Sequence, residues 1–163
     1  MIVVGVVYHS KTGNTKKMAE EVTAGIEAGQ GEFEGVLKSV EEAAVDDFLE
    51  WDGIIIGSPT YYGLPSAQIK DLLDRSIKHH GKLEGKVGGA FTSSANRGGG
   101  NETAIIAILE MMLIHGMIVQ GTSSKDHYGP VAVGEPDERA IEESRDLGLR
   151  VAELCQRLNV TGA

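Results

Sequence analysis

The amino-terminal end of the chain changes from apolar to polar within a few residues. The segment Ile2–Tyr8 reads IVVGVVY, an apolar run without alternation, which is typical of a β-strand buried on both faces. A polar segment, HSKTGNT, follows, and then Met18, Val22 and Ile26 recur at helical spacing. This pattern predicts a strand, a tight turn, and a helix that begins near Asn14.

The same alternation of strand and helix patterns continues to the end of the chain, which is typical of β-α-β units in a parallel sheet. The predicted strands are Ile2–Tyr8, Gly35–Val40, Gly53–Gly57, Val87–Thr92 and Met117–Gly121. The predicted helices are Asn14–Ala28, Ser66–His79, Glu102–His115 and Asp137–Leu158, with a short one between Val40 and Trp51. Five strands with helices on both faces predict a single α/β domain over residues 1–163. Its expected form is a three-layer sandwich around a parallel sheet in the order 2-1-3-4-5.

Composition and charge narrow the classes of function. The 163 residues carry a formal net charge of −9, which disfavours nucleic acid and anionic membranes and favours a basic protein partner. Cys155 is the only cysteine, which excludes a disulfide framework and a cysteine-ligated iron–sulfur or zinc site within the chain. The start of the chain does not resemble a secretion signal, and the apolar stretch from Ala104 to Val119 is too short to span a membrane. We therefore expect a cytoplasmic protein without a membrane segment or a metal site.

The polar turn after the first strand carries the first candidate chemistry. Ser10, Thr12 and Thr15 offer hydroxyl groups, and the following helix would direct free backbone N–H groups and the positive end of its dipole into the turn. These donors favour a phosphate group. Turn and N-cap roles would explain Ser10, Asn14 and Thr15 equally well without any ligand. A nucleotide-triphosphate loop is disfavoured because Ser10 stands where that motif needs its second glycine, and no dinucleotide fingerprint follows any strand.

Two further loops are unusual, and they follow the third and fourth strands. SPTYYGLPSAQ combines prolines, Gly63 and the adjacent tyrosines Tyr61 and Tyr62, while TSSANRGGGNET combines small hydroxyl residues with glycines. Taken singly, these loops also fit tyrosine packing and a mobile glycine turn. Because the carboxyl ends of parallel strands share one edge of the sheet, all three loops should meet there. A phosphate site beside a site for a flat ring suggests a mononucleotide with a planar aromatic head.

These motifs resemble those of a known superfamily. SKTGNT resembles the phosphate loop of flavodoxins, and GSPTYYG, FTSSANRGGGNETAIIAI and LIHGM resemble the WrbA-type NAD(P)H:quinone oxidoreductases of the same flavodoxin-like superfamily. The resemblance covers essentially the whole chain and implies a flavodoxin-like fold with FMN as cofactor. It implies that the phosphate is held by the first loop, through Ser10, Thr12, Gly13, Asn14 and Thr15. It implies that the flavin ring lies between Pro59, Thr60, Tyr61, Tyr62 and Gly63 on one side and Ser93, Ser94, Ala95, Asn96, Arg97, Gly98 and Gly99 on the other.

The resemblance also assigns a role to His115, which falls where the WrbA-type enzymes carry a histidine in contact with the ring. A capping role at the end of its helix is the alternative. The loop SSANRGGG has no aromatic residue, so one face of the ring is expected to stay open.

Three functions remain open at this point. The acidic charge, the short chain and SKTGNT favour an electron carrier that docks a basic redox protein. SSANRGGGNET and His115 favour an NAD(P)H:quinone oxidoreductase of the WrbA type, with NAD(P)H and quinone as partners. No catalytic side chain is expected in either, because the flavin carries the chemistry. The third class is a nonredox ligand-binding domain of the same fold.

The helical segment NETAIIAILEMMLIHG is apolar on almost all sides. It predicts either the self-association surface of a homo-oligomer or a central helix covered by its neighbours.

Overall fold

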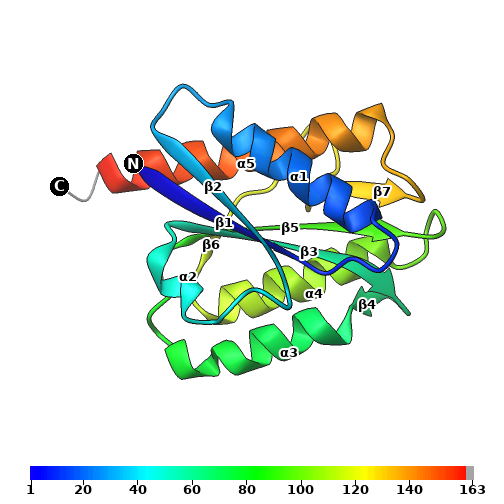
Figure 1. The fold of residues 1–163 in the computed structure, drawn as a ribbon, viewed down its shortest axis with the longest axis horizontal. Helices are drawn as coiled ribbons and strands as arrows, with labels where there is room; N and C mark the ends of the chain where they lie inside the picture. Colours follow the sequence, from blue (N-terminus) through cyan, green and yellow to red (C-terminus); the bar gives the residue numbers. More distant parts are fainter. Residues whose placement is uncertain (161–163) are drawn as a thin grey trace.

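In the computed structural model, which describes residues 1–160, a twisted sheet lies between two layers of helices (Figure 1). Residues 161–163 of the expected domain lie outside the described range. The strands are β1 (Ile2–Tyr8), β2 (Phe33–Ser39), β3 (Gly53–Tyr61), β4 (Leu64–Pro65), β5 (Val87–Ser94), β6 (Ile118–Val119) and β7 (Val131–Val133). The parallel sheet runs in the order β2-β1-β3-β5-β6. The predicted flavodoxin-like architecture, with its strand order 2-1-3-4-5, is confirmed.

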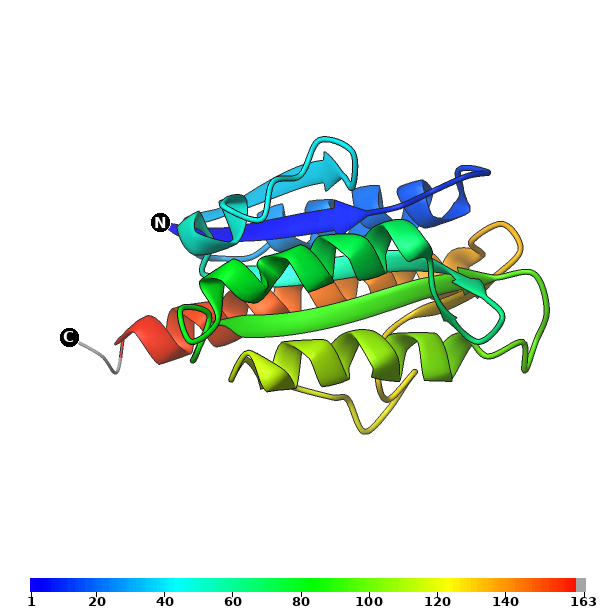
Figure 2. The ribbon, with the colours of Figure 1, turned by 90° about the horizontal axis from the view of Figure 1, so that it is seen from below.

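The helices cover both faces of this sheet. They are α1 (Asn14–Glu27), α2 (Asp47–Glu50), α3 (Ala67–Arg75) with the 3-10 turn η1 (Ser76–His79), α4 (Asn101–Ile114) and α5 (Glu138–Val160). Helices α1 and α5 lie side by side on one face, and α3 and α4 lie on the other (Figures 1 and 2). None of the helices within residues 1–160 combines the length and the apolar character needed to cross a bilayer.

The apolar runs of the central strands supply two separate cores. Successive side chains of a strand point to opposite faces, so Ile54 and Ile56 pack under α3 and α4 while Ile55 packs under α1 and α5. All three are almost fully buried. This is why these strands read as continuous apolar segments rather than as alternating ones.

The fifth strand is interrupted, which differs from the prediction of one strand over Met117–Gly121. The short β6 pairs with the beginning of β5, and β7 pairs with its end, opposite residues Thr92 to Ser94. Residues 120–130 form a loop between the two pieces. The sequence did not predict β7, because three residues between Pro130 and Gly134 are too few to show a strand period.

Strand β4 was also not predicted. It pairs antiparallel with the end of β3, with Tyr61 opposite Leu64, and therefore turns the loop after the third strand into a hairpin. Most other boundaries agree with the predicted ones within one or two residues. The three candidate loops follow the carboxyl ends of β1, β3 and β5, and Figure 1 shows them at the same end of the sheet.

Candidate functional site

The first loop joins β1 to α1 and is shaped for an anion. Gly13 has a φ of 97°, and its N–H donates to Ser10 Oγ at 3.1 Å. Helix α1 has no side-chain cap and no acidic residue in its first turn, so its first N–H groups meet no competing carboxylate of that turn. A Cβ placed on Gly13 would find no heavy atom within 4 Å, which leaves open space beside these donors. This combination of hydroxyls, N–H groups and space fits a phosphate.

Thr15 connects the first loop to the third. Its side chain is buried in the first turn of α1, and its Oγ1 lies 2.8 Å from Oγ of Ser93 at the end of β5. Ser93 is also buried. Because each hydroxyl carries one proton and the bond between them uses only one, this pair joins the two loops and still leaves one O–H to donate.

The second loop is a two-residue hairpin between β3 and β4. Tyr62 and Gly63 form its tip with φ values of 51° and 80°, the signs that a type I′ turn requires. A positive φ is uncommon for an aromatic residue, and such residues cluster at functional sites. Tyr62 is fully exposed, and Tyr61 is 40% exposed with its ring edge-on to that of His9 at a centroid distance of 6.5 Å. The hairpin therefore presents two tyrosine rings at the end of the sheet.

The third loop follows β5 and leads into α4. Ser93 and Ser94 are buried, whereas residues 95–99 are exposed. Ser94 Oγ donates to the carbonyl oxygen of Asn96 at 3.0 Å and accepts from Asn101 Nδ2 at 3.3 Å. The loop is therefore held at its base and presents main chain, the side chains of small residues and Arg97 at its tip.

Hydrogen bonds and close packing bring the second and third loops together. Thr60 Oγ1 lies 2.7 Å from Thr92 Oγ1. Thr103, in the first turn of α4, donates to the carbonyl oxygen of Gly63 at 2.7 Å. A Cβ on Gly100 would lie 2.4 Å from Gly63 Cα, so this close approach needs glycine. The structure thus brings the three predicted loops together at one end of the sheet.

Sequence reasoning missed four residues of this site: His9, Gly100, Asn101 and Thr103. His9 is 9% exposed, and its Nδ1 is buried without a hydrogen-bond partner among the described residues. Its position directly after a buried strand was an available signal. Asn101 and Thr103 belong to a helix, and their contacts with the loops depend on the tertiary fold.

His115 does not join the loops. It follows the last residue of the 14-residue helix α4, which begins at the third loop and is about 20 Å long at a rise of 1.5 Å per residue. Its Nε2 lies 2.8 Å from Ser76 Oγ, and its ring lies 6.2 Å from that of His80. Burial, with the nearby charges of His80 and His79, lowers the pKa of His115. Within one copy of the chain, helix α4 places His115 at the end opposite the three loops, so the expected contact between His115 and the ring stays a prediction.

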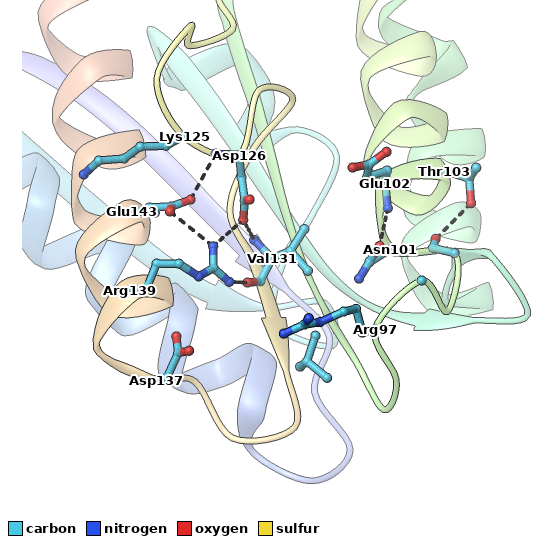
Figure 3. Close-up of a pocket in the computed structure, with 13 residues that line it drawn as sticks. Arg97, Asn101, Glu102, Thr103, Lys125, Asp126, Val131, Asp137, Arg139 and Glu143 are labelled. Atoms are coloured by element: carbon cyan, nitrogen blue, oxygen red, sulfur yellow. Dashed lines mark hydrogen bonds and ion pairs between the residues drawn. The ribbon is translucent and has the colours of Figure 1, made fainter.

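A cavity of about 680 Å³ lies behind the third loop, between the first turns of α4 and α5 and strand β7 (Figure 3). Arg97 of the third loop points into it. Arg139 donates to Asp126 at 2.8 Å, to Glu143 at 3.2 Å and to the carbonyl oxygen of Val131 at 2.8 Å. Burial and the charge of Asp126 raise the pKa of Glu143. Asp126, Arg139 and Glu143 bind one another, so they anchor the segment that precedes β7 to helix α5.

The single cysteine lies away from the loops, in the packed layer of α5. Burial raises the pKa of the Cys155 thiol to about 12, so the thiol stays protonated near neutral pH and is a poor nucleophile. No group of three His, Cys, Asp or Glu residues suited to a metal ion occurs within residues 1–160.

Comparisons with known proteins agree with this geometry. A family model described as NADPH-dependent FMN reductase matches residues 34–128. The chain is 43% identical over 156 residues to a flavodoxin of Aquifex aeolicus, covering 91% of this chain and 84% of the relative. It is 32% identical over 185 residues to an NAD(P)H dehydrogenase (quinone) of Archaeoglobus fulgidus, covering 94% and 97%. The crystal structure of a flavodoxin, WrbA-like protein from Agrobacterium tumefaciens superposes with a TM-score of 0.82 at 31% identity, covering 96% and 99%.

Proposed function

The chain belongs to the NADPH-dependent FMN reductase family, and from this premise we propose that it is an FMN-binding, flavodoxin-like oxidoreductase that carries electrons between redox partners. The observation that supports the proposal best is the junction of three loops at one end of the sheet. One loop fits a phosphate, and the other two lie beside it. The contacts Thr15–Ser93 and Thr103–Gly63 hold the three loops together.

In this proposal the first loop binds the phosphate of FMN. Its backbone N–H groups, the positive end of the α1 dipole and hydroxyl donors neutralise the anion, so no lysine is required. The open space at Gly13 lets the phosphate approach the main chain. The residues assigned to this role are Ser10, Thr12, Gly13, Asn14 and Thr15.

The hairpin and the third loop flank the flavin ring. The hairpin contributes Pro59, Thr60, Tyr61, Tyr62 and Gly63, and the third loop contributes Ser93, Ser94, Ala95, Asn96, Arg97, Gly98 and Gly99. FMN supplies the electron-accepting ring, and the protein determines its access and electrostatic surroundings. Because the tyrosines stand on one side only, the opposite side has no aromatic side chain, and a partner or substrate can approach there.

Electron transfer to a basic protein partner is the main function that we propose. The net charge of −9 steers a basic partner toward the molecule at long range. This step needs only an exposed cofactor edge, so no side chain of this chain acts as a nucleophile or general base. A cytoplasmic location agrees with this role and is part of the proposal.

NAD(P)H:quinone oxidoreduction is the second candidate. The exposed Tyr62 hairpin and the small residues of the third loop favour it, because they leave room for a second flat ring against the flavin site. The similarity to an NAD(P)H dehydrogenase (quinone) over 94% of this chain supports the same candidate.

We also propose that the chain forms a homo-oligomer through the end of helix α4. Ile105, Ile108 and Met112 are buried, whereas Leu113 and Ile114 are 58% and 73% exposed. The helix is therefore not covered on all sides, which favours self-association over the buried alternative. Sedimentation velocity at several protein concentrations tests this proposal, and a monomer at every concentration contradicts it.

Three flavin measurements test the proposed function. The protein as purified, or after addition of FMN, is expected to show visible flavin absorbance and saturable quenching of FMN fluorescence. A colourless protein without FMN affinity would instead support the nonredox class. Anaerobic addition of NADPH and then NADH to the FMN-loaded protein separates the two redox candidates. Slow or absent bleaching of the visible band supports the carrier, and rapid bleaching supports the reductase.

A further inference from the structure

We propose that Thr103, a residue of helix α4 outside the three loops, is the positioning residue that fixes the tyrosine hairpin as one wall of the ring site. The inference rests on the proposed function for its ligand, but the contact itself is a property of the chain without ligand. Thr103 Oγ1 donates to the carbonyl oxygen of Gly63, at the tip of the hairpin, at 2.7 Å. No other side-chain hydroxyl of the described residues reaches this carbonyl in the structure.

The hairpin has little packing of its own to hold it in place. Only two residue pairs join β3 and β4, Thr60 with Pro65 and Tyr61 with Leu64. Tyr62 is fully exposed and Leu64 is 58% exposed, so the tip gains little from burial. A hairpin of this size is marginal by itself, and contacts from outside must determine its orientation.

Helix α4 is a rigid source for such a contact. Ala104 and Ile105, which follow Thr103, are fully buried under the sheet, so the first turn of the helix has a fixed position. Gly100 brings the same turn against the main chain of Gly63, where a Cβ would lie only 2.4 Å from the Gly63 Cα. The hydroxyl of Thr103 is therefore held directly at the tip of the hairpin by two independent features, packing below and close approach beside it.

The hydroxyl also has a second acceptor, which makes the contact reversible. Thr103 Oγ1 lies 2.9 Å from the carbonyl oxygen of Gly100, but a hydroxyl has one proton and donates to one acceptor at a time. If the Gly63 carbonyl turns away, the hydroxyl keeps a partner within its own helix. The hairpin can thus leave its position without leaving the Thr103 hydroxyl unpaired, and ligand contacts can shift the balance between the two states.

Removal of this hydroxyl should weaken ring binding without touching the phosphate loop. In Thr103→Val the hairpin samples other orientations. Only the fraction of molecules with the hairpin in the orientation described here then binds the flavin, which lowers the apparent affinity. Loss of one ordinary hydrogen bond corresponds to about a fivefold increase in Kd. The increase should be the same for FMN and for riboflavin, because riboflavin lacks only the phosphate. Thr103→Ser keeps the donor and should restore the affinities of the native protein.

The matched control is Thr23→Val. Thr23 lies in helix α1, and its Oγ1 donates to the carbonyl oxygen of Ala19 at 2.9 Å, so this variant loses a hydroxyl with a similar local bond far from the hairpin. Each variant is compared in two assays. Fluorescence titration gives the Kd for FMN and for riboflavin, and hydrogen exchange on the flavin-free protein gives the protection of the peptide that contains residues 61–64.

The expected result is faster exchange in residues 61–64 of Thr103→Val, with an equal rise of both Kd values, and native behaviour in Thr103→Ser and Thr23→Val. The proposal is overturned if Thr103→Val exchanges and binds like the native protein, if Thr103→Ser fails to restore either property, or if Thr23→Val gives the same loss. If the native protein binds neither flavin, the proposed function fails, while the exchange data still decide whether Thr103 fixes the hairpin.

Discussion

The contact between Thr15 and Ser93 gives a quantitative test of how the first and third loops are joined. The two hydroxyl oxygens are 2.8 Å apart, in side chains that are 1% and 7% exposed, and neither hydroxyl has another partner among the described residues. Thr15→Val leaves the Ser93 hydroxyl buried and unpaired, and Ser93→Ala leaves that of Thr15. Each single variant should lose about 1–3 kcal/mol of unfolding free energy, because an unpaired buried polar group carries its full desolvation cost.

The double variant should lose much less than the sum of the two, because it removes both hydroxyls together. We expect a coupling free energy of about 1–2 kcal/mol from the complete double-mutant cycle. Urea unfolding at equilibrium, followed by circular dichroism, measures the four unfolding free energies. In a domain of this size each 1 kcal/mol corresponds to a shift in Tm of about 2–4 °C, which gives an independent check. Losses that add within about 0.3 kcal/mol would refute the claim that this bond joins the loops.

Four further predictions concern the loops and the histidine at the far end of α4. Thr12 is exposed, so Thr12→Asp should leave the fold intact. In fluorescence titrations the Kd for FMN should rise by charge repulsion while the Kd for riboflavin stays unchanged. An unchanged Kd for FMN would contradict the phosphate assignment. Tyr62→Ala should leave the unfolding free energy within about 0.5 kcal/mol of the native value, because the side chain is fully exposed. The variant should weaken flavin binding by about 0.5–1.5 kcal/mol through lost stacking. Unaltered binding would shift this role to Tyr61. Gly100→Ala should lower the Tm and weaken the binding of both FMN and riboflavin, because it adds a Cβ against Gly63 at a residue with a φ of 86°. An unchanged Tm would show that the loops do not approach as described. The pKa of His115 is lowered from its ordinary 6.5, so just below pH 6.5 the unfolded chain binds more protons than the folded one. The unfolding free energy should therefore fall as the pH drops below about 6.5. Urea unfolding at several pH values should show a smaller fall in His115→Gln, and an equal dependence of the unfolding free energy on pH in both proteins would contradict the burial argument.

The fold was largely predictable from the sequence because its signals are local and strong. Buried strands such as Ile2–Tyr8 and Gly53–Gly57 read as apolar runs, and the helices show regular apolar spacing. The strand order followed from the same alternation together with the family resemblance. Strands β4 and β7 were missed because two or three residues carry no period, and their pairing partners supply the hydrogen bonds that define them.

The site was predictable in its loops but not in its connections. Ser10 and Thr15, the tyrosine pair and the glycine-rich loop stand next to strand ends, and the parallel topology brings strand ends together. Thr103 could not be identified, because its role depends on how helix α4 meets the hairpin. His115 shows the limit of a short motif: its similarity suggested a ring contact, whereas the length of α4 places the residue away from the loops of its own chain.

A crystal structure of the protein grown with excess FMN tests the central claim most directly. We expect electron density for the phosphate at Ser10, Thr12 and the first turn of α1, and for the flavin ring between the Tyr62 hairpin and the loop of residues 93–99. Density for FMN at another surface, or ordered solvent alone between these loops at saturating FMN, would contradict the account.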